Sequence, residues 1–215
     1  MVTRHRTGCG GRVAATPIRC DTRHPMSTEN AQLFFSLLTL IAAGGTIILV
    51  GLQIASLAGS RGAGRIGATI QEASTWLAFL VATTATLGSL YFSEIADFVP
   101  CRLCWFQRIA MYPLSAILLV GAIRRDTAVR WYAAPIAVVG AGIALYHYLV
   151  EWNPGLETAS CALTGPSCSA FWFREFGFIT LAFMALVGFL TILTLLLVRF
   201  PARLDSDVPH QEELP

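Results

Sequence analysis

The feature that most constrains this chain is a series of apolar segments long enough to cross a lipid bilayer. A bilayer core of about 30 Å needs about 20 consecutive apolar residues in a helix. Four runs without a charged side chain reach that length. A fifth run, between Arg108 and Arg124, has only 15 uncharged residues, so its helix has to include Arg108 and begin near Leu103. The five segments are residues 33–58, 74–93, 103–124, 131–150 and 176–198. The sequence therefore predicts an all-α membrane protein with five transmembrane helices.

The composition agrees with this fold class. Hydrophobic residues make up 55% of the 215 residues and charged residues only 13%, which is about half the share in ordinary soluble domains. All 15 basic residues are arginines, and they are scattered along the chain, which argues against nucleic-acid binding. We expect an additional transmembrane helix within residues 26–73, with a flexible glycine-rich linker at 59–67. A four-transmembrane-helix bundle is expected to follow at residues 74–200.

Both ends of the chain are expected to lie outside the helices. Met26 is a plausible start directly before the first helix, so residues 1–25 are interpreted as a non-native or disordered extension. The alternative is a genuine basic tail outside the cytoplasm, since this segment carries five arginines. Residues 201–215 are rich in acidic side chains and are expected to form a disordered tail.

Arginines in the short loops predict the orientation, because cytoplasmic loops carry the excess of positive charge. Without the N-terminal segment, seven arginines fall on one side and three on the other. The five arginines of that segment would raise the three to eight, and the two sides would then no longer differ clearly. The seven are Arg61, Arg65, Arg124, Arg125, Arg130, Arg199 and Arg203, and the three are Arg102, Arg108 and Arg174. The side with seven, which includes the C-terminus, is expected to be cytoplasmic.

Six cysteines form three pairs along the sequence. The pairs are Cys9 with Cys20, Cys101 with Cys104, and Cys161 with Cys168. The first lies in the N-terminal segment, and no chemistry is assigned to it. The second is a CxxC at the start of a transmembrane helix, where the helix N-terminus favours a thiolate. The third lies in a loop and can close a small disulfide ring. The last two pairs fall on the arginine-poor side, and disulfides persist outside the cytoplasm.

The residues alone leave three interpretations of these last two pairs open. They can be redox-active pairs that exchange electrons, static staples of a non-catalytic membrane scaffold, or four ligands of one zinc ion. Zinc is disfavoured in an oxidising compartment, and no histidine is expected near the four sulfurs, so no metal is expected.

The residues around the CxxC resemble the disulfide bond formation protein B family. The run Pro-Cys-Arg-Leu-Cys-Trp-Phe-Gln-Arg at residues 100–108 carries most of the resemblance, which extends over residues 74–200. Residues 90–94, 111–114, 168–169 and 176–180 are also similar to that family. The short gap between Cys161 and Cys168 is similar to the branch with a compact second loop. The helix at residues 33–58 departs from the family's four-helix plan.

This resemblance implies a protein-dithiol:quinone oxidoreductase of the bacterial plasma (inner) membrane. Such an enzyme reoxidises an extracytoplasmic thioredoxin-like thiol oxidase and passes the electrons to membrane quinone, either ubiquinone or menaquinone. By family order, Cys161 forms the mixed disulfide with the partner, Cys168 passes electrons to Cys101, and Cys104 faces the quinone. A vitamin-K-epoxide-reductase-like enzyme is an alternative, but in that family the CxxC follows the loop cysteines, whereas here it precedes them.

Two further residues are candidates for quinone binding. Arg108 follows Cys104 by four residues and so lies one turn along on the same helix face. A guanidinium there can stabilise a thiolate and the negative charge that develops on a quinone oxygen, although snorkelling to the headgroups is the alternative. Family placement also puts His147 near the quinone, with a hydrogen-bonded interior histidine as the alternative.

Overall fold

The computed structural model describes residues 28–158, 161 and 165–200. The predictions for residues 1–25 and 201–215 lie outside the described residues. The described chain is helical, with a single isolated bridge between Glu175 and Ile179 in place of any strand. The α-helices are α1 (Thr28–Leu57), α2 (Arg61–Glu72), α3 (Ser74–Leu90), α4 (Arg102–Arg124), α5 (Val129–Trp152) and α7 (Leu181–Leu197). A π-helical turn (Tyr91–Ile95) continues α3, and a 3-10 turn (Pro154–Leu156) follows α5.

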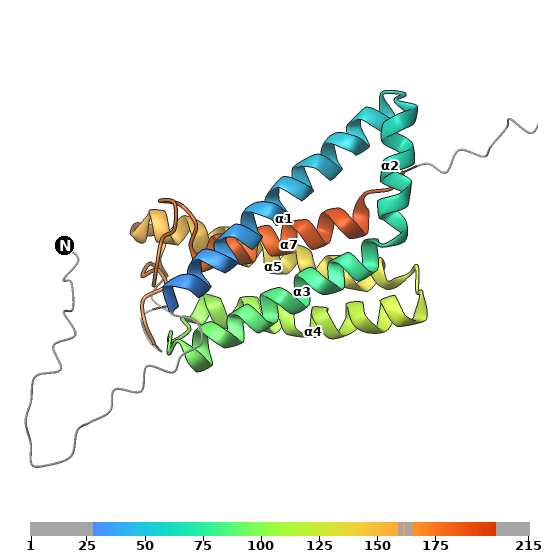
Figure 1. The fold of residues 1–215 in the computed structure, drawn as a ribbon. Helices are drawn as coiled ribbons and strands as arrows, with labels where there is room; N and C mark the ends of the chain where they lie inside the picture. The colour runs from blue at the N-terminus through green and yellow to red at the C-terminus, as the bar shows by residue number, and fades with distance from the viewer. Residues whose placement is uncertain (1–27, 159–160, 162–164, 201–215) are drawn as a thin grey trace, which may run out of the picture.

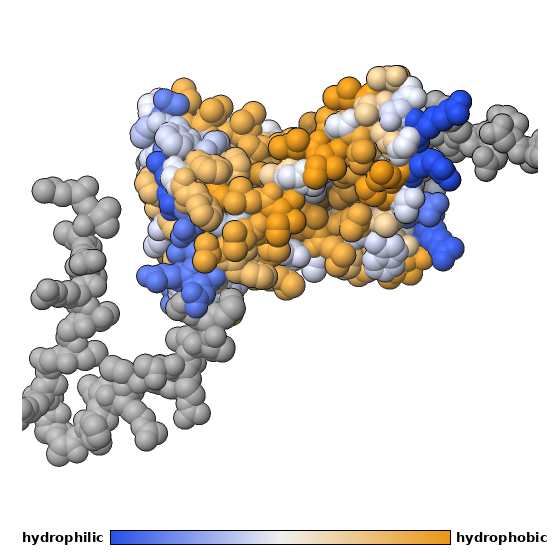
Figure 2. Space-filling model, turned by 45° about the horizontal axis from the view of Figure 1, so that its top comes forward, coloured by the Kyte–Doolittle hydropathy of each residue, from blue (hydrophilic) through white to orange (hydrophobic). Residues whose placement is uncertain are grey.

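The helix lengths confirm the predicted class of all-α membrane protein. Among the described residues, four helices are long and apolar enough to cross a membrane, namely α1, α3 with its π-helical turn, α4 and α5. The apolar helix α7 has 17 residues, which is at the lower limit for a transmembrane helix. Figure 2 shows a broad apolar band between two hydrophilic ends, as expected for a surface that faces lipid.

Four of the helices close into a bundle. Helix α4 packs between α3 and α5, α5 packs on α7, and α7 returns to α3. Alanine, leucine and isoleucine fill the core, with the buried ring of Phe189 at its centre. A side chain at Gly140 would overlap that ring, so the glycine allows α5 and α7 to approach closely. Helix α1 lies outside this bundle, across α7 (Figure 1).

The prediction of a flexible linker at residues 59–67 is wrong, because most of this segment belongs to helix α2. Ser60 caps the helix, and its Oγ accepts a hydrogen bond from the Ala63 backbone N–H. Glycines lower helix propensity by about 1 kcal/mol each, but tertiary packing compensates here. The Phe200 ring packs on Gly67, and the Phe200 backbone N–H donates to Gln71 Oε1 at 2.8 Å.

The last helix begins at Leu181, five residues later than the predicted start at residue 176. Phe176 and Gly177 both have positive φ angles, 50° and 81°, which a right-handed helix does not allow. The chain instead makes a tight turn closed by the Glu175–Ile179 bridge. Thr180 then caps α7 by accepting a hydrogen bond from the Phe183 N–H.

The arginine-rich loops and the cysteine loops lie at opposite ends of the bundle. Helix α2 and the turn between α4 and α5 lie at one end, and the N-terminus of α4 lies at the other (Figure 1). The loop that carries Cys161 and Cys168 is at the same end as the start of α4. The four sulfurs outside the N-terminal segment are therefore concentrated at one end of the molecule.

Candidate redox site

The first cysteine pair is built around the N-terminus of α4. Cys101 is the N-cap residue, and its Sγ accepts a hydrogen bond from the Cys104 backbone N–H at 3.2 Å. This cap brings the two Sγ atoms to 2.7 Å from each other, with both residues as free cysteines. Because the CxxC spacing covers one helical turn, small movements suffice to close these thiols into a disulfide.

Cys101 has the chemistry of a nucleophile. A hydrogen bond with the Cys104 side chain lowers the pKa of Cys101 from its ordinary value of 9.0 to about 5. Burial opposes this shift, while His147 and the Cys104 backbone N–H act in the same direction as the Cys104 side chain. The thiolate is the reactive form of cysteine, so Cys101 is poised to react at neutral pH.

His147 supports Cys101 from the neighbouring helix α5. Its Nε2 lies 3.5 Å from Cys101 Sγ, and its Nδ1 lies 3.1 Å from Gln107 Nε2. An amide nitrogen can only donate, so in this arrangement Nδ1 accepts and Nε2 carries the proton that points at the sulfur. The structure thus places His147 against a cysteine, and the expectation that no histidine lies near the four sulfurs is wrong. Gln107 was not predicted as a site residue, although it lies within the motif at residues 100–108.

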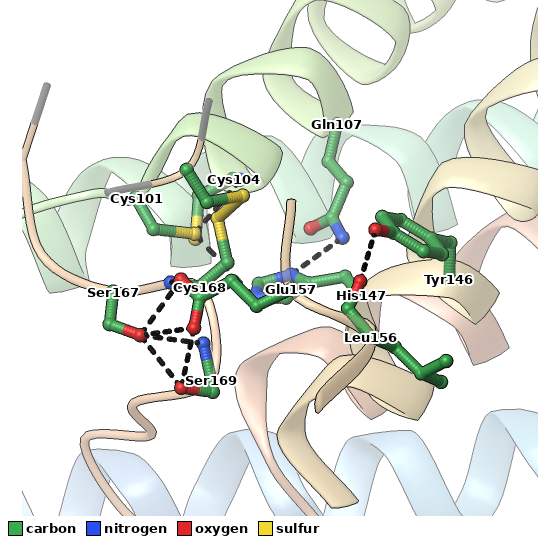
Figure 3. Close-up of a disulfide and its surroundings, with 11 residues drawn as sticks. Cys101, Cys104, Gln107, Tyr146, His147, Leu156, Glu157, Ser167, Cys168 and Ser169 are labelled. Carbon is green, nitrogen blue, oxygen red and sulfur yellow. Dashed lines mark hydrogen bonds between the residues drawn. A yellow bond between two sulfur atoms is a disulfide. The ribbon is translucent and has the colours of Figure 1, made fainter. Parts of the chain in front are cut away.

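The second pair is a disulfide between Cys161 and Cys168. Both cysteines are buried, and they pack in one apolar cluster with Cys101, Leu103 and Val150. Figure 3 shows this disulfide beside the two thiols at the start of α4. A disulfide in contact with a dithiol is the arrangement that thiol–disulfide exchange requires, since a thiolate must reach a sulfur of the disulfide.

Glu157 fixes the loop that carries this disulfide. Its carboxylate accepts hydrogen bonds from the Ser167 hydroxyl at 2.7 and 2.8 Å, from the Cys168 N–H at 2.8 Å and from the Ser169 hydroxyl at 2.8 Å (Figure 3). The bond from Ser167 is the largest cause that lowers the pKa of Glu157. Sequence reasoning missed this residue, because a lone glutamate ten to twelve residues from its partners carries no local signal.

In the part of the chain that the structure describes, two groups of side chains bring possible metal ligands together. One is Cys101, Cys104 and His147, and the other is Glu157, Cys161 and Cys168, with the ligand atoms of each group within 4.8 Å of one another. Two sulfurs on one tetrahedral zinc ion lie about 3.8 Å apart, whereas Cys101 and Cys104 are 2.7 Å apart. The second group contains a formed disulfide. Both geometries fit thiol–disulfide chemistry better than zinc binding.

Arg108 reaches sideways to helix α3. Its Nε donates to Ser89 Oγ and its second guanidinium nitrogen to the Ser89 carbonyl oxygen, each at 3.0 Å. The guanidinium also lies 5.3 Å from the centroid of the Trp105 ring. Tyr112 donates to the same Ser89 hydroxyl at 3.3 Å. The guanidinium of Arg108 is therefore bound to α3. Sequence reasoning could not have identified Ser89 as its partner.

An apolar cavity of about 480 Å³ borders this site. It runs between α1, α3, α4 and α7, and Cys104, Gln107 and Arg108 line it on the α4 side. Its volume is in the range of small-molecule sites, which are mostly apolar with a few polar groups. His147 is not among the residues that line the cavity. The cavity is therefore an apolar space with one thiol, Cys104, and one cation, Arg108, in its wall.

The fold and this site together define a membrane oxidoreductase of thiols and disulfides. The chain belongs to the disulfide bond formation protein DsbB family, whose model matches residues 71–199. This match confirms the resemblance inferred from the sequence, and with it a role in disulfide bond formation. Helix α1 lies outside the matched residues.

Curated relatives agree with this assignment. Disulfide bond formation protein C of Bacillus subtilis (strain 168) is 46% identical over 118 residues, which cover 55% of this chain and 86% of the relative. A probable disulfide formation protein C 1 of Bacillus anthracis is 43% identical over 57% of this chain and 88% of its own length. A probable disulfide formation protein of Coxiella burnetii (strain CbuK_Q154) is 39% identical over 61% and 90%, respectively. No solved structure matches the chain significantly.

Proposed function

We propose that this protein is a protein-dithiol:quinone oxidoreductase of the bacterial inner membrane. It reoxidises an extracytoplasmic thioredoxin-like protein and passes the electrons to membrane quinone. The observation that carries this proposal is the packing of the Cys161–Cys168 disulfide against the Cys101–Cys104 pair, whose second thiol lines an apolar cavity. One end of this arrangement suits a protein dithiol and the other a lipid-soluble acceptor.

The first exchange takes place at the loop disulfide. A thiolate of the partner attacks Cys161 Sγ, the Cys161–Cys168 bond breaks, and Cys168 leaves as a thiolate. The partner's second thiolate then attacks the mixed disulfide, which releases an oxidised partner and a reduced Cys161. Two electrons and the two thiol protons have then left the partner, and this chain holds the electrons as two reduced cysteines. Because both loop cysteines are buried, the loop has to open before the partner can reach Cys161. The hydrogen bonds of Glu157 hold the closed form of the loop.

The second exchange takes place between the two pairs of this chain. With Cys101 and Cys104 oxidised, the Cys168 thiolate attacks Cys101 Sγ and Cys104 leaves as a thiolate. Cys161 then attacks Cys168 Sγ and Cys101 leaves as a thiolate, which restores the loop disulfide and leaves the electron pair on Cys101 and Cys104. The Nε2–H of His147 stabilises Cys101 whenever it carries negative charge.

The residues around the cavity fit a quinone. Its walls are apolar, while Cys104 and Arg108 supply a reducing thiol and a cation on the α4 side. A quinone bound there would supply the oxidant, taking up two electrons and two protons as Cys101 and Cys104 return to their disulfide. Arg108, held by Ser89, presents positive charge to the reacting oxygen. Cys104 faces the cavity, while Cys101 remains buried.

The proposed orientation puts the cysteine end outside the cytoplasm and the arginine-rich end inside. The positive-inside rule supports it, because Arg61, Arg65, Arg124, Arg125 and Arg130 all belong to the end that carries α2 and the α4–α5 turn. Disulfide exchange with a secreted partner also requires an oxidising compartment.

The proposal is tested with the purified protein in lipid nanodiscs, a reduced thioredoxin-like dithiol protein and quinone. We expect dithiol-dependent quinone reduction by the parent. Cys161→Ser should abolish oxidation of the partner but leave the reduced Cys101–Cys104 pair able to reduce quinone. Cys104→Ser should block quinone reduction and accumulate mixed disulfides. Full oxidation of the partner by Cys161→Ser would refute the order, and a loop disulfide that resists the dithiol protein would instead indicate a static staple.

A further inference from the structure

Helix α1 is the part of the molecule that the family does not account for, and it forms one wall of the cavity. The match to the family begins at residue 71, after α1 has ended at Leu57. The cavity-lining positions of α1 recur every three or four residues and so form a single helix face. They include Phe35, Thr39, Ala42, Gly45, Thr46 and Leu49.

Helix α1 is attached to the bundle at two levels. At the cysteine end, the Phe35 ring packs on Gly88 of α3 and lies 5.5 Å from the ring of Phe92. Near the middle of the helix, the hydroxyls of Thr46 and Thr191 form a hydrogen bond of 2.9 Å between α1 and α7. Eleven residues of helix separate these attachments, a rise of about 16 Å. The wall between them is therefore held in place without filling the cavity.

Near the middle of α1, a glycine without a side chain forms part of the cavity wall. A side chain at Gly45 would meet no atom within 4 Å, although Gly45 lines the cavity. The neighbouring Gly44 also has open space around it but does not line the cavity. On the α7 side, Met184, Gly188 and Thr191 face the same space. The part of the cavity beside Gly45 is apolar and lies away from the cysteines.

From these observations we infer that α1 forms the outer wall of a channel for the hydrophobic tail of the quinone. The inference rests on the proposed function, which puts the quinone ring beside Cys104 and Arg108. A tail attached to that ring must extend along apolar surface, and the cavity continues from Arg108 to Gly45 and Thr46 between α1, α3 and α7. Helix α1 thus makes the enzyme selective for quinones by their tails.

The two adjacent glycines supply a matched pair of variants. Gly45→Leu adds a side chain at an exposed position that lines the cavity, and Gly44→Leu adds the same side chain about 100° around the helix, at a position that does not line it. Both replace a helix-interior glycine, so both change helix propensity equally. The measurement is the KM for a quinone with a long isoprenoid tail divided by the KM for the same ring without a tail, on the full chain in nanodiscs.

We expect Gly45→Leu to raise this KM ratio about tenfold or more, the scale of a steric mismatch in an apolar pocket. Gly44→Leu should leave the ratio at the parent value. An unchanged ratio in Gly45→Leu, or an equal rise in both variants, would overturn the inference while leaving the proposed function intact. A parent protein that reduces neither quinone would instead refute the proposed function.

A second pair covers the case in which Gly45→Leu does not fold. Ala42→Phe fills the channel one turn closer to the cysteines, since Ala42 lines the cavity, whereas the adjacent Ala43 does not. The KM ratio should rise in Ala42→Phe and stay at the parent value in Ala43→Phe. Equal ratios in these two variants would overturn the inference.

Discussion

Arg108 lies within the transmembrane helix α4, and a residue of the neighbouring helix α3 fixes the position of its guanidinium. Placing arginine at membrane depth costs a few kcal/mol, so such residues usually face a partner or a cavity. Here two hydrogen bonds to Ser89 hold the guanidinium beside a cavity that Cys104 also lines. This geometry favours a role in the reaction over simple snorkelling.

We therefore expect Arg108→Ala to lower the rate of quinone reduction about a hundredfold, the usual cost of removing one charge-stabilising donor. Arg108→Lys should recover only part of this loss, because a point charge lacks the planar fork that binds Ser89 in two places. Stopped-flow kinetics of quinone reduction by the purified variants provide the measurement.

The control for this experiment is Arg102→Ala. Arg102 lies on the same helix and is exposed, but it does not line the cavity. Its removal changes the charge equally and should leave the rate near that of the parent. An Arg108→Ala rate within about threefold of the parent would reduce Arg108 to an interfacial anchor.

The low pKa of Cys101 depends on individual neighbouring residues. With its pKa lowered to about 5, Cys101 should be a thiolate throughout the neutral range. In the form with Cys101 and Cys104 reduced, alkylation of Cys101 should hold a constant rate at neutral pH and fall with a midpoint at about pH 5. Mass spectrometry of protein quenched at different pH values measures this profile.

Variants of the two neighbours test the cause of this acidity. The hydrogen bond with Cys104 is the largest cause of the low pKa, and His147 contributes less. Cys104→Ala should therefore raise the midpoint more than His147→Ala does. A parent midpoint close to the ordinary value of 9.0 would contradict the assignment of Cys101 as the activated thiol.

At the scale of elements, the carboxylate of Glu157 holds the described part of the loop between α5 and α7. The pKa of Glu157 lies below its ordinary value of 4.5, first because of the hydrogen bond from Ser167. A lowered pKa means that the ordered loop favours the ionised form. The contribution of Glu157 to loop stability is therefore complete at neutral pH, and it is lost as the pH falls below 4.5 through the lowered value.

Glu157→Gln should loosen this loop at neutral pH. We expect hydrogen exchange at the Cys168 amide to become about fivefold faster, which corresponds to a net hydrogen bond of about 1 kcal/mol. In the parent, the Cys168 amide should lose this protection only in acid, where Glu157 becomes protonated. Glu94→Gln removes an exposed carboxylate elsewhere and should not affect this amide, so equal effects of the two variants would show that Glu157 does not order the loop.

The helices could be predicted from sequence where hydropathy alone determines them, but their boundaries depend on more distant contacts. The apolar runs identified α1, α3, α4 and α5 within a few residues. Helix α2 was missed because its glycines suggest a flexible linker, whereas the packing of Phe200 against Gly67 stabilises it. The start of α7 was misplaced because the positive φ of Phe176 has no signature in the hydropathy of the segment.

At the scale of the whole molecule, sequence reasoning found the sulfurs but not what surrounds them. Cysteine spacing brings Cys101 to Cys104 and Cys161 to Cys168, because partners three or seven residues apart are within local reach. The contacts of His147 with Gln107 and of Arg108 with Ser89 join different helices. Only the packing of the bundle determines such contacts, so a single sequence cannot reveal them.

The concentration of all four sulfurs at one end of the bundle has an energetic consequence for the proposed cycle. In that cycle electrons enter at Cys161 and leave at Cys104, and both cysteines lie at the same end of the molecule. Turnover therefore carries no net charge through the membrane dielectric. A potential of 100 mV, worth about 2.3 kcal/mol for each charge moved across, neither drives nor opposes the reaction. The proposed cycle is thus expected to run at the same rate at any membrane potential.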